Sequence, residues 1–296
     1  MTPAAPPRLF DRARVARNRD RAAPRYEDYA FLKERVSRDI ADRVQDTPRR
    51  FECALDLGCH DGRLARILSG TGRAGAVEAS DLVDAARAAG TDARVLDEET
   101  PSLPENRFDL IVSALSLHWV NDLPGTLVRL RQSLKPDGLF LGALFGAGTL
   151  AELRDCLMEA ETDLSGGVSP RLSPLPGLKD MANLMQRAGF ALPVADRDSV
   201  VVRYRDPARL LADLKGMGEQ SALAPGMIRP LPRAVLDRAL SLYRERHADP
   251  DGRVRASFEI VHVSGWAPAP GQPQPLRPGS AKASLADAVR KQAKRD

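Results

Sequence analysis

The fold of this chain is decided by one short stretch, Leu55-Asp56-Leu57-Gly58-Cys59-His60-Asp61-Gly62. It follows an apolar approach at residues 51–54 and precedes a helix-like run at 63–68, so the pattern predicts a strand, a glycine-bearing turn and a helix. Glycine lets the backbone take a positive φ and come close to a ligand. The N-terminus of the following helix offers free N–H groups to polar or anionic ligand atoms. The stretch therefore predicts a binding loop, unless its glycines serve only the turn.

The loop resembles motif I of the class I S-adenosylmethionine (SAM) methyltransferases, in which an acidic residue is followed by three alternating glycines. Asp56, Gly58 and Gly62 match this motif, and His60 stands where the family usually has its middle glycine. The resemblance implies a SAM site formed by Asp56, Gly58, Cys59, His60 and Gly62. The side chain of His60 would occupy a place where only backbone normally passes the cofactor. A degenerate, weakly binding site is therefore the competing interpretation.

Composition bounds the class of protein. The chain has 296 residues, of which 43% are hydrophobic and 28% charged, as in ordinary soluble globular proteins. No apolar run approaches the roughly 20 residues needed to cross a bilayer, and residues 1–7 lack the apolar segment of a secretory signal. Cys53, Cys59 and Cys156 form no metal or disulfide spacing and suit a reducing cytosol. We expect a cytoplasmic protein without a transmembrane segment.

Charge is distributed unevenly along the chain. Residues 1–50 carry a net charge of +5 and residues 277–296 a net charge of +4, whereas the remainder carries −5. An enzyme that acts on nucleic acid needs a basic face beside its site, so we expect no nucleic-acid partner. We interpret the basic ends as solvated tails, with a partner-docking role as the alternative. Residues 267–296 are rich in Pro and Gly and then in Lys, Arg and Ala, which predicts disorder or loose helix.

The rest of the chain alternates between strand and helix patterns. An amphipathic helix is expected at residues 26–44 and ends before Pro48. Strands are expected at residues 75–80, 93–96, 110–115, 139–145, 198–204 and 256–266. Together with the strand before the loop, they predict an α/β fold with a doubly wound, mostly parallel seven-stranded sheet. Residues 1–50 would form a helical lead-in and 51–266 the main domain, with a helical insertion at about 150–195 and 206–250.

Two acidic residues are candidates for binding the cofactor at the ends of the second and third strands. Glu78, in the pattern Glu78-x-Ser80, looks like the family's acid that accepts both ribose hydroxyls. Asp81 is the alternative ribose acid. In a purely structural interpretation, Ser80 or Asp81 caps the following helix. Asp97 follows the third strand, where an acid in this class often takes the adenine amino group. A solvated acidic turn is the competing interpretation of Asp97.

The run from Ser116 to Pro124 follows the fourth strand, beside the first strand in the usual order. Ligands of open α/β sheets bind outside the carboxyl ends of strands at such a switch point. We therefore expect Ser116 at the cofactor, and His118 and Trp119 facing the cofactor and substrate pocket. His118 titrates near neutrality by default and is a candidate catalytic base, or a hydrogen-bonding wall residue. Trp119 is a candidate for stacking on substrate or adenine, or a core residue.

Several stretches resemble one particular group of proteins. They are Phe10-Asp11-Arg12 and residues 39–44, 115–124, 134–138, 166–174 and 214–219. The group is the mitochondrial complex I assembly factor described as an arginine hydroxylase, with its bacterial homologues. The resemblance covers most of residues 8–266. It implies SAM binding and modification of an arginine on the iron–sulfur subunit at the quinone-site end of complex I, which would bring the protein transiently to the inner face of the membrane. A more distant resemblance is to the malonyl-acyl-carrier-protein O-methyltransferase of biotin synthesis.

The chemistry leaves three hypotheses open. They are a SAM-dependent protein-modifying enzyme of complex I assembly, an O-methyltransferase of a small or carrier-bound carboxylate, and a non-catalytic assembly chaperone with a weakened SAM pocket. Hydroxylation needs an oxidant, usually iron held by two histidines and a carboxylate. Of four histidines, only His60 and His118 are expected near each other, with Asp61 close by. Because His60 departs from the family's glycine, we predict no metal site.

Overall fold

The computed structural model describes residues 8–84, 92–227 and 229–273 of the chain. Its strands are β1 (Phe51–Leu57), β2 (Ala74–Asp81), β3 (Ala93–Val95), β4 (Phe108–Ala114), β5 (Leu134–Phe145), β6 (Ala191–Tyr204) and β7 (Val254–Trp266). They form one seven-stranded sheet in the order β3-β2-β1-β4-β5-β7-β6. β7 runs antiparallel to β5 and β6, and the other neighbours pair in parallel. The predicted fold class is therefore confirmed.

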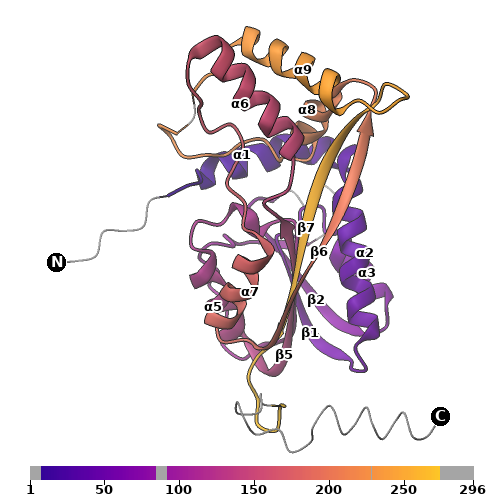
Figure 1. Ribbon diagram of the computed structural model, residues 1–296. Coiled ribbons are helices and arrows are strands. Elements are labelled where there is room, and N and C mark those ends of the chain that lie inside the picture. The colour runs from indigo at the N-terminus through magenta and orange to yellow at the C-terminus, as the bar shows by residue number, and fades with distance from the viewer. Residues whose placement is uncertain (1–7, 85–91, 228, 274–296) are drawn as a thin grey trace, which may run out of the picture.

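Helices cover both faces of the sheet, as Figure 1 shows. α2 (Phe31–Asp46) and α3 (Arg63–Gly70) lie on one face. α5 (Leu123–Ser133) and α7 (Leu178–Arg187) lie on the other. This arrangement leaves the carboxyl edge of the parallel strands as the place where loops from several strands meet.

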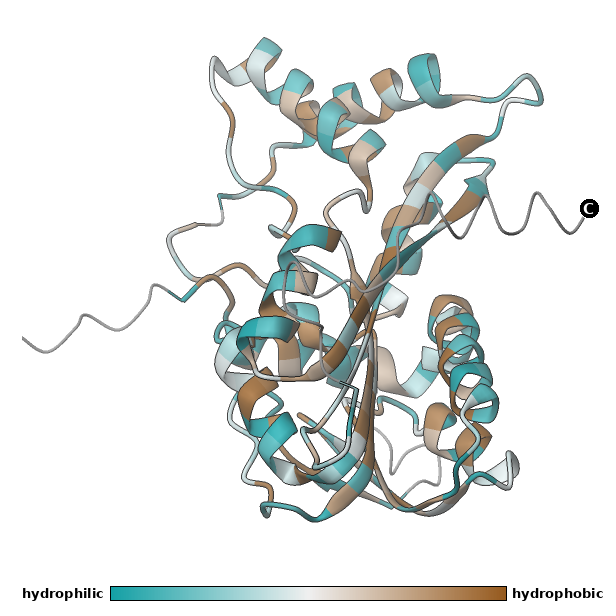
Figure 2. Cartoon of the chain, turned by 60° about the horizontal axis from the view of Figure 1, so that its bottom comes forward, coloured by the Kyte–Doolittle hydropathy of each residue, from teal (hydrophilic) through white to brown (hydrophobic). Residues whose placement is uncertain are grey.

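The central strand β4 shows why the sheet is recognisable from sequence. All seven of its residues are buried. Leu110 and Val112 belong to the core that contains α2 and α3, whereas Ile111 belongs to the core that contains α5 and α7. A strand covered on both faces is apolar throughout rather than alternating. Figure 2 shows brown, hydrophobic segments along the strands, and helices that carry both hydrophobic and hydrophilic residues.

The Arg-rich segment before the domain folds as helix α1 (Arg12–Ala22) followed by the 3₁₀ segment η1 (Ala23–Tyr29). Asp11 caps α1 by accepting a hydrogen bond from the backbone N–H of Arg14. The buried residues of α1 lie on one helical face and are Val15, Asn18, Arg19 and Ala22. The sequence predicted a helical lead-in over residues 1–50 but gave no bounds for this helix, because two of those four buried positions are polar. The helix expected from residue 26 begins only at Phe31.

A layer of helices lies beyond the carboxyl edge of the sheet. It consists of α6 (Ala151–Ser165), α8 (Pro207–Gly216) and α9 (Arg233–His247), and the long strands β6 and β7 reach toward it in Figure 1. The helices expected as an insertion after the fifth strand therefore lie in two places. α6, α8 and α9 form this layer, whereas α7 packs on a face of the sheet. Each helix in the described ranges is too short or too polar to span a bilayer. The helix that a cap at Ser80 or Asp81 would begin and the basic tail both extend outside the described residues.

Candidate active site

The loop after β1 forms one wall of the candidate site. Gly58, His60 and Gly62 have positive φ values of 74°, 53° and 72°. The backbone N–H groups of Gly58 and Cys59 both donate to the carbonyl of Ser80, at 2.8 and 2.9 Å, which ties the loop to the end of β2. The predicted strand, glycine-bearing turn and helix therefore exist as expected.

Gly58 is required by close packing as well as by its φ. A Cβ at position 58 would lie 2.1 Å from Oγ of Ser116, far inside van der Waals contact. Ser116 follows β4, so this contact joins the ends of the two central strands. The structure thus brings together two of the residues predicted to bind the cofactor.

His60 adopts the left-handed conformation that favours glycine, at the position of the motif's middle glycine. Its imidazole is buried and stacks on Tyr26, with ring centroids 5.3 Å apart and an interplanar angle of 5°. Burial, and then the positive charges of Lys33 and Arg19, hold its pKa well below the ordinary value. The ring is therefore neutral at pH 7, and Nδ1 accepts a hydrogen bond from Lys33 Nζ at 2.9 Å.

Lys33 is a buried cation that sequence reasoning missed. It lies on α2, is 2% exposed, and donates from Nζ to the carbonyls of Gly58 and Ala114 at 2.8 and 2.5 Å. With His60, these partners use all three of its N–H groups. Burial lowers the pKa of Lys33, while Asp56 and Asp81 oppose the shift. Lys33 therefore fastens α2 to the carboxyl ends of β1 and β4.

Asp56 ends β1 with a fully buried carboxyl group. Its Oδ2 accepts a hydrogen bond from the backbone N–H of Ala65, in the first turn of α3, at 3.1 Å. Its Oδ1 is buried without a hydrogen-bond partner in the described part of the chain. Burial raises the pKa of Asp56 to about 6, and Lys33 limits the rise. A buried acceptor without a partner is costly, so Oδ1 is available to a ligand donor.

Asp81, and not Glu78, is the acid beside the loop. β2 extends to Asp81, whose buried Oδ2 accepts the backbone N–H of His60 at 2.8 Å. Glu78 lies three residues earlier, where its partly exposed carboxylate forms an ion pair with Arg107. The preferred ribose candidate thus lies away from the loop, because the strand runs further than its apolar pattern suggested. The alternative, Asp81, occupies the expected place.

Arg19 of α1 lies against the same acid. Its Nη1 is 2.9 Å from Asp81 Oδ1 and 2.5 Å from Glu98 Oε1, and its Nη2 donates to Ser116 Oγ at 2.8 Å. The side chains of Arg19, Asp81 and Glu98 are at most 3% exposed. Burial opposes ionisation of Glu98, but Arg19, Arg12 and the hydrogen bond from Ser116 together outweigh it and hold the Glu98 pKa below its ordinary value. A buried ion-pair cluster therefore joins α1 to the carboxyl ends of β2, β3 and β4.

Two predicted site residues turn away from this cluster. Asp97, the adenine candidate, is partly exposed and pairs with Arg12 at 2.6 Å, whereas its neighbour Glu98 points inward. Cys59 contributes only its backbone, because its side chain packs in a small core with Ala65 and Ala79. Burial raises the pKa of the Cys59 thiol well above its ordinary value, so it remains protonated.

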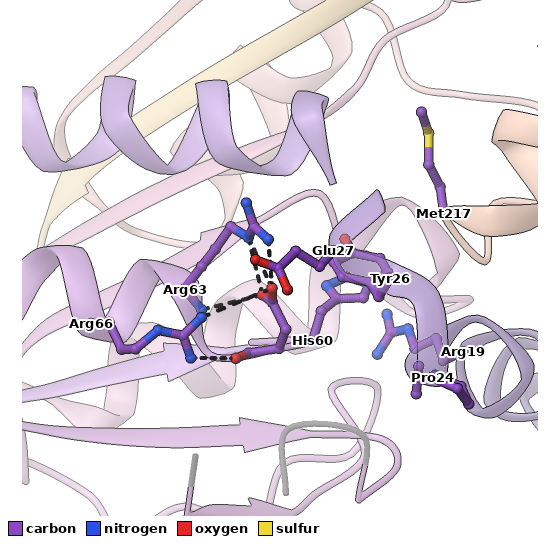
Figure 3. A pocket seen from close by; sticks show the side chains of 10 residues that line it. Arg19, Pro24, Tyr26, Glu27, His60, Arg63, Arg66 and Met217 are labelled. Carbon is purple, nitrogen blue, oxygen red and sulfur yellow. Dashed lines mark hydrogen bonds and ion pairs between the residues drawn. The ribbon is translucent and has the colours of Figure 1, made fainter. Parts of the chain in front are cut away.

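A cavity of about 320 Å³ opens beside the loop. Figure 3 shows Arg19, Tyr26 and His60 around it, with Arg63 on one side and Met217 on the other. Its lining is polar on the side of the loop and comes from α1, η1, α3 and the turn after α8. The cavity adjoins the loop predicted to bind the cofactor.

A second and larger cavity, about 510 Å³, lies between the end of β4 and the helical layer. His118 and Trp119, on the 3₁₀ segment η2 (Leu117–Trp119), form its inner wall. His118 Nε2 and Trp119 Nε1 each lie 2.9 Å from Oε2 of Glu219. His118 Nδ1 has no hydrogen-bond partner among the described residues. The structure therefore places both sequence-predicted catalytic candidates on one pocket. It adds Glu219, whose signal in the sequence was its place at the end of the family-like stretch 214–219.

Metal-binding chemistry was considered for His60, His118 and Asp61. Within the described ranges, no three His, Cys, Asp or Glu side chains gather as a metal-ligand group. His262 lies on β7 and pairs in register with Ala143 and Asp196, and His247 ends α9. These two histidines belong to other parts of the fold.

Comparison with known proteins identifies the family. Residues 26–193 match the family described as a methyltransferase domain. The chain is 40% identical over 290 residues to the mitochondrial arginine-hydroxylase NDUFAF5 of Rattus norvegicus, covering 95% of this chain and 84% of that protein. It is 34% identical over 282 residues to a malonyl-[acyl-carrier protein] O-methyltransferase of Halorhodospira halophila, covering 90% of each.

Solved structures share the fold. The YcgJ protein of Bacillus subtilis superposes with a TM-score of 0.54 at 14% identity, covering 77% of this chain and 97% of that one. A Haloferax volcanii methyltransferase solved with its Trm112 activator superposes with a TM-score of 0.52 at 19% identity, covering 88% of this chain and 100% of that one.

The human NDUFAF5 protein is also 40% identical to this chain, over 287 residues, covering 94% of this chain and 83% of that protein. The chain therefore belongs to the methyltransferase-domain family and, within it, to the family of the arginine-hydroxylase NDUFAF5.

Proposed function

We propose that this protein binds SAM and modifies an arginine side chain of another protein, the iron–sulfur subunit of respiratory complex I. The family and the 40% identity to proteins named arginine-hydroxylase support the type of residue modified. The resemblance of the sequence supports the partner, which would bring the protein to the inner face of the membrane. The observation that carries the cofactor assignment is the buried acid Asp81, held by the backbone of His60 at the end of β2.

The residues at this edge fit SAM. Asp81 would accept the ribose hydroxyls, and Oδ1 of Asp56, which has no partner in the described part of the chain, would accept the cofactor's ammonium group. The turn between Gly58 and Gly62 would approach the cofactor through its backbone. SAM supplies a methyl group on a sulfonium. Arg19 lies on Oδ1 of Asp81, the backbone N–H of His60 lies on Oδ2, and the residue is fully buried. The ribose would therefore have to displace Arg19 to reach this carboxylate.

The second cavity would hold the arginine. His118 lies on its wall, and its Nε2–H can donate to Glu219, which leaves the Nδ1 lone pair free within the described structure. A base at this position could take a proton from a substrate N–H. Positioning supplies much of the acceleration of a group transfer. Ser116 packs against Gly58 of the loop and is two residues before His118, so the loop and the second cavity are joined by one short segment.

Two other functions compete with this proposal. An O-methyltransferase of a carrier-bound carboxylate is favoured by the 34% identity to the Halorhodospira enzyme. A non-catalytic assembly chaperone is favoured by two features of the site, the imidazole at position 60 and the ion pair between Arg19 and Asp81. The three functions differ in whether SAM binds and in which substrate, if any, is modified.

Calorimetric titration of the purified protein with SAM and with S-adenosylhomocysteine tests the cofactor assignment. Micromolar binding is expected, and no binding at millimolar ligand would leave the chaperone as the function to pursue. Mass spectrometry of the complex I iron–sulfur subunit, after incubation with protein and SAM, tests the substrate. An added methyl group on one arginine supports the proposal, whereas methylation of a malonyl-carrier thioester instead would overturn it.

A further inference from the structure

Glu219 lines the second cavity. Its side chain is only 10% exposed. Both of its hydrogen bonds within the described ranges, from His118 and Trp119, reach the same oxygen, Oε2. Oε1 receives no hydrogen bond in that part of the chain, although Glu219 lines the cavity. A carboxylate held this way is oriented by the protein but only half satisfied.

The walls around Glu219 are mostly apolar. They come from the end of β5 and from the helical layer, and they include Phe145, Leu153, Leu157, Leu211 and Leu214. The cationic side chains on the lining are Arg171 and Arg229. Arg171 is paired with Glu161 through both carboxylate oxygens, and Arg229 is exposed at the rim. The interior of the cavity therefore contains one carboxylate with no cationic side chain bound to its open oxygen.

We infer that this cavity is the binding site for the substrate's arginine, with the guanidinium donating to Glu219 Oε1. A carboxylate in an apolar pocket is best compensated by a charged donor. The methylenes of an arginine side chain can pack along apolar walls while its head reaches a polar group. The substrate class and the choice of cavity rest on the proposed function, and the assignment of Glu219 as the residue that binds the guanidinium goes beyond it.

The same geometry disfavours a carboxylate substrate. An anion entering this cavity would face the negative charge of Glu219 in surroundings that screen charge poorly. His118 and Trp119 cannot reverse that charge, because both are already bonded to Oε2. Glu219 is thus the specificity-determining residue that separates a guanidinium from a malonyl carboxylate.

The test uses the full-length protein and a small probe, Nα-acetyl-arginine N-methylamide, compared with its uncharged citrulline counterpart. Binding is followed by NMR through the indole N–H of Trp119, which donates to Glu219. We expect the arginine probe to shift this resonance and to bind at least about tenfold more tightly than the citrulline probe, as hydrogen bonds to charged groups imply. Equal affinity for the two probes, or no shift with either, would overturn the inference.

The variant Glu219→Gln has nearly the same shape and can still accept from His118 and Trp119, but it lacks the charge. It is expected to lose the preference for arginine over citrulline and to keep its affinity for SAM. Glu27→Gln is the matched control, because Glu27 lines the other cavity. Unchanged arginine preference in Glu219→Gln contradicts the inference. Failure of the wild-type protein to bind SAM would instead contradict the proposed function, whatever the probes show.

Discussion

Arg19 Nη1 and Asp81 Oδ1 are 2.9 Å apart, and both side chains are buried. This ion pair joins the first helix of the chain to the end of the second strand. The same guanidinium contacts Glu98 and Ser116, so one side chain of α1 reaches the ends of three strands. Because Asp81 is the acid proposed to hold the ribose, Arg19 and the cofactor require the same carboxylate.

Replacing Arg19 by Met is expected to tighten SAM binding while weakening the fold. The cofactor would no longer have to displace a guanidinium, and a coupling of about 1–3 kcal/mol corresponds to roughly 5-fold to 150-fold in affinity. Removing one partner of a buried ion pair typically lowers the free energy of unfolding by about 3–5 kcal/mol. Calorimetry with SAM and urea unfolding measure the two effects.

Arg17→Met is the matched control for Arg19. Arg17 lies on the same helix, its side chain is 53% exposed, and its only ion pair with another described residue is a 3.6 Å contact with Asp11. Neither SAM affinity nor stability should change measurably, since exposed pairs contribute little. Loss of SAM binding in Arg19→Met, with Arg17→Met unaffected, would mean that Arg19 holds the cofactor rather than competing with it.

Asp81→Asn and Glu78→Gln distinguish the two ribose candidates. The first should weaken SAM binding by about tenfold or more, because a hydrogen bond to a charged acceptor contributes roughly 1.5–3 kcal/mol. The second should leave the affinity unchanged, since Glu78 pairs with Arg107 at a partly exposed site away from the loop. Both affinities come from the same titration. The opposite pattern would restore Glu78 as the ribose acid.

Much of the site was predictable because its signals are local. The loop from Gly58 to Gly62 lies between a strand and a helix in the sequence, and the run containing Ser116, His118 and Trp119 directly follows an apolar strand. The position of each segment at the carboxyl edge then follows from the strand order of the fold. No long-range contact has to be known to reach this result.

What sequence reasoning missed depends on contacts between distant segments. β2 reaches Asp81 because its last residues pair with β3, at Ser80↔Arg94 and Asp81↔Val95. Lys33 lies next to the apolar stripe of α2, and in the sequence it looks like a solvated lysine. Only the fold shows that its ammonium group meets the carbonyls of Gly58 and Ala114. Arg19 and Glu98 are separated by 79 residues, so neither could be recognised as buried by its neighbours in sequence.

Replacing His60 by Gly is expected to strengthen SAM binding by several-fold. The left-handed conformation costs a residue with a Cβ about 1–2 kcal/mol, and the imidazole lies in the loop where the motif has only backbone. Asn106→Gly is the control, because Asn106 also has a positive φ, 49°, but lies on an exposed turn away from the loop. An unchanged SAM affinity in His60→Gly would show that His60 does not limit the pocket.

Asp56→Asn is expected to stabilise the protein and to weaken its SAM binding. Burial raises the pKa of Asp56 to about 6 from its ordinary value of 3.8, so above pH 6 the charged carboxylate disfavours the folded state. That penalty is at most about 3 kcal/mol. It disappears as the pH falls from 6 to below 3.8, where the carboxyl group is protonated in both states. Asparagine carries no charge and can still accept from Ala65.

Urea unfolding of wild type and Asp56→Asn at several pH values measures this effect. The variant should be more stable near pH 8, and the difference should shrink toward zero near pH 4. SAM affinity should fall. When the asparagine oxygen accepts from Ala65, the uncharged amide NH2 takes the place of Oδ1, and the cofactor's ammonium group loses its charged acceptor. A variant that is stabilised yet binds SAM normally would remove Asp56 from the cofactor site. A variant that is destabilised at pH 8 would show instead that the charge of Asp56 is needed to compensate buried Lys33.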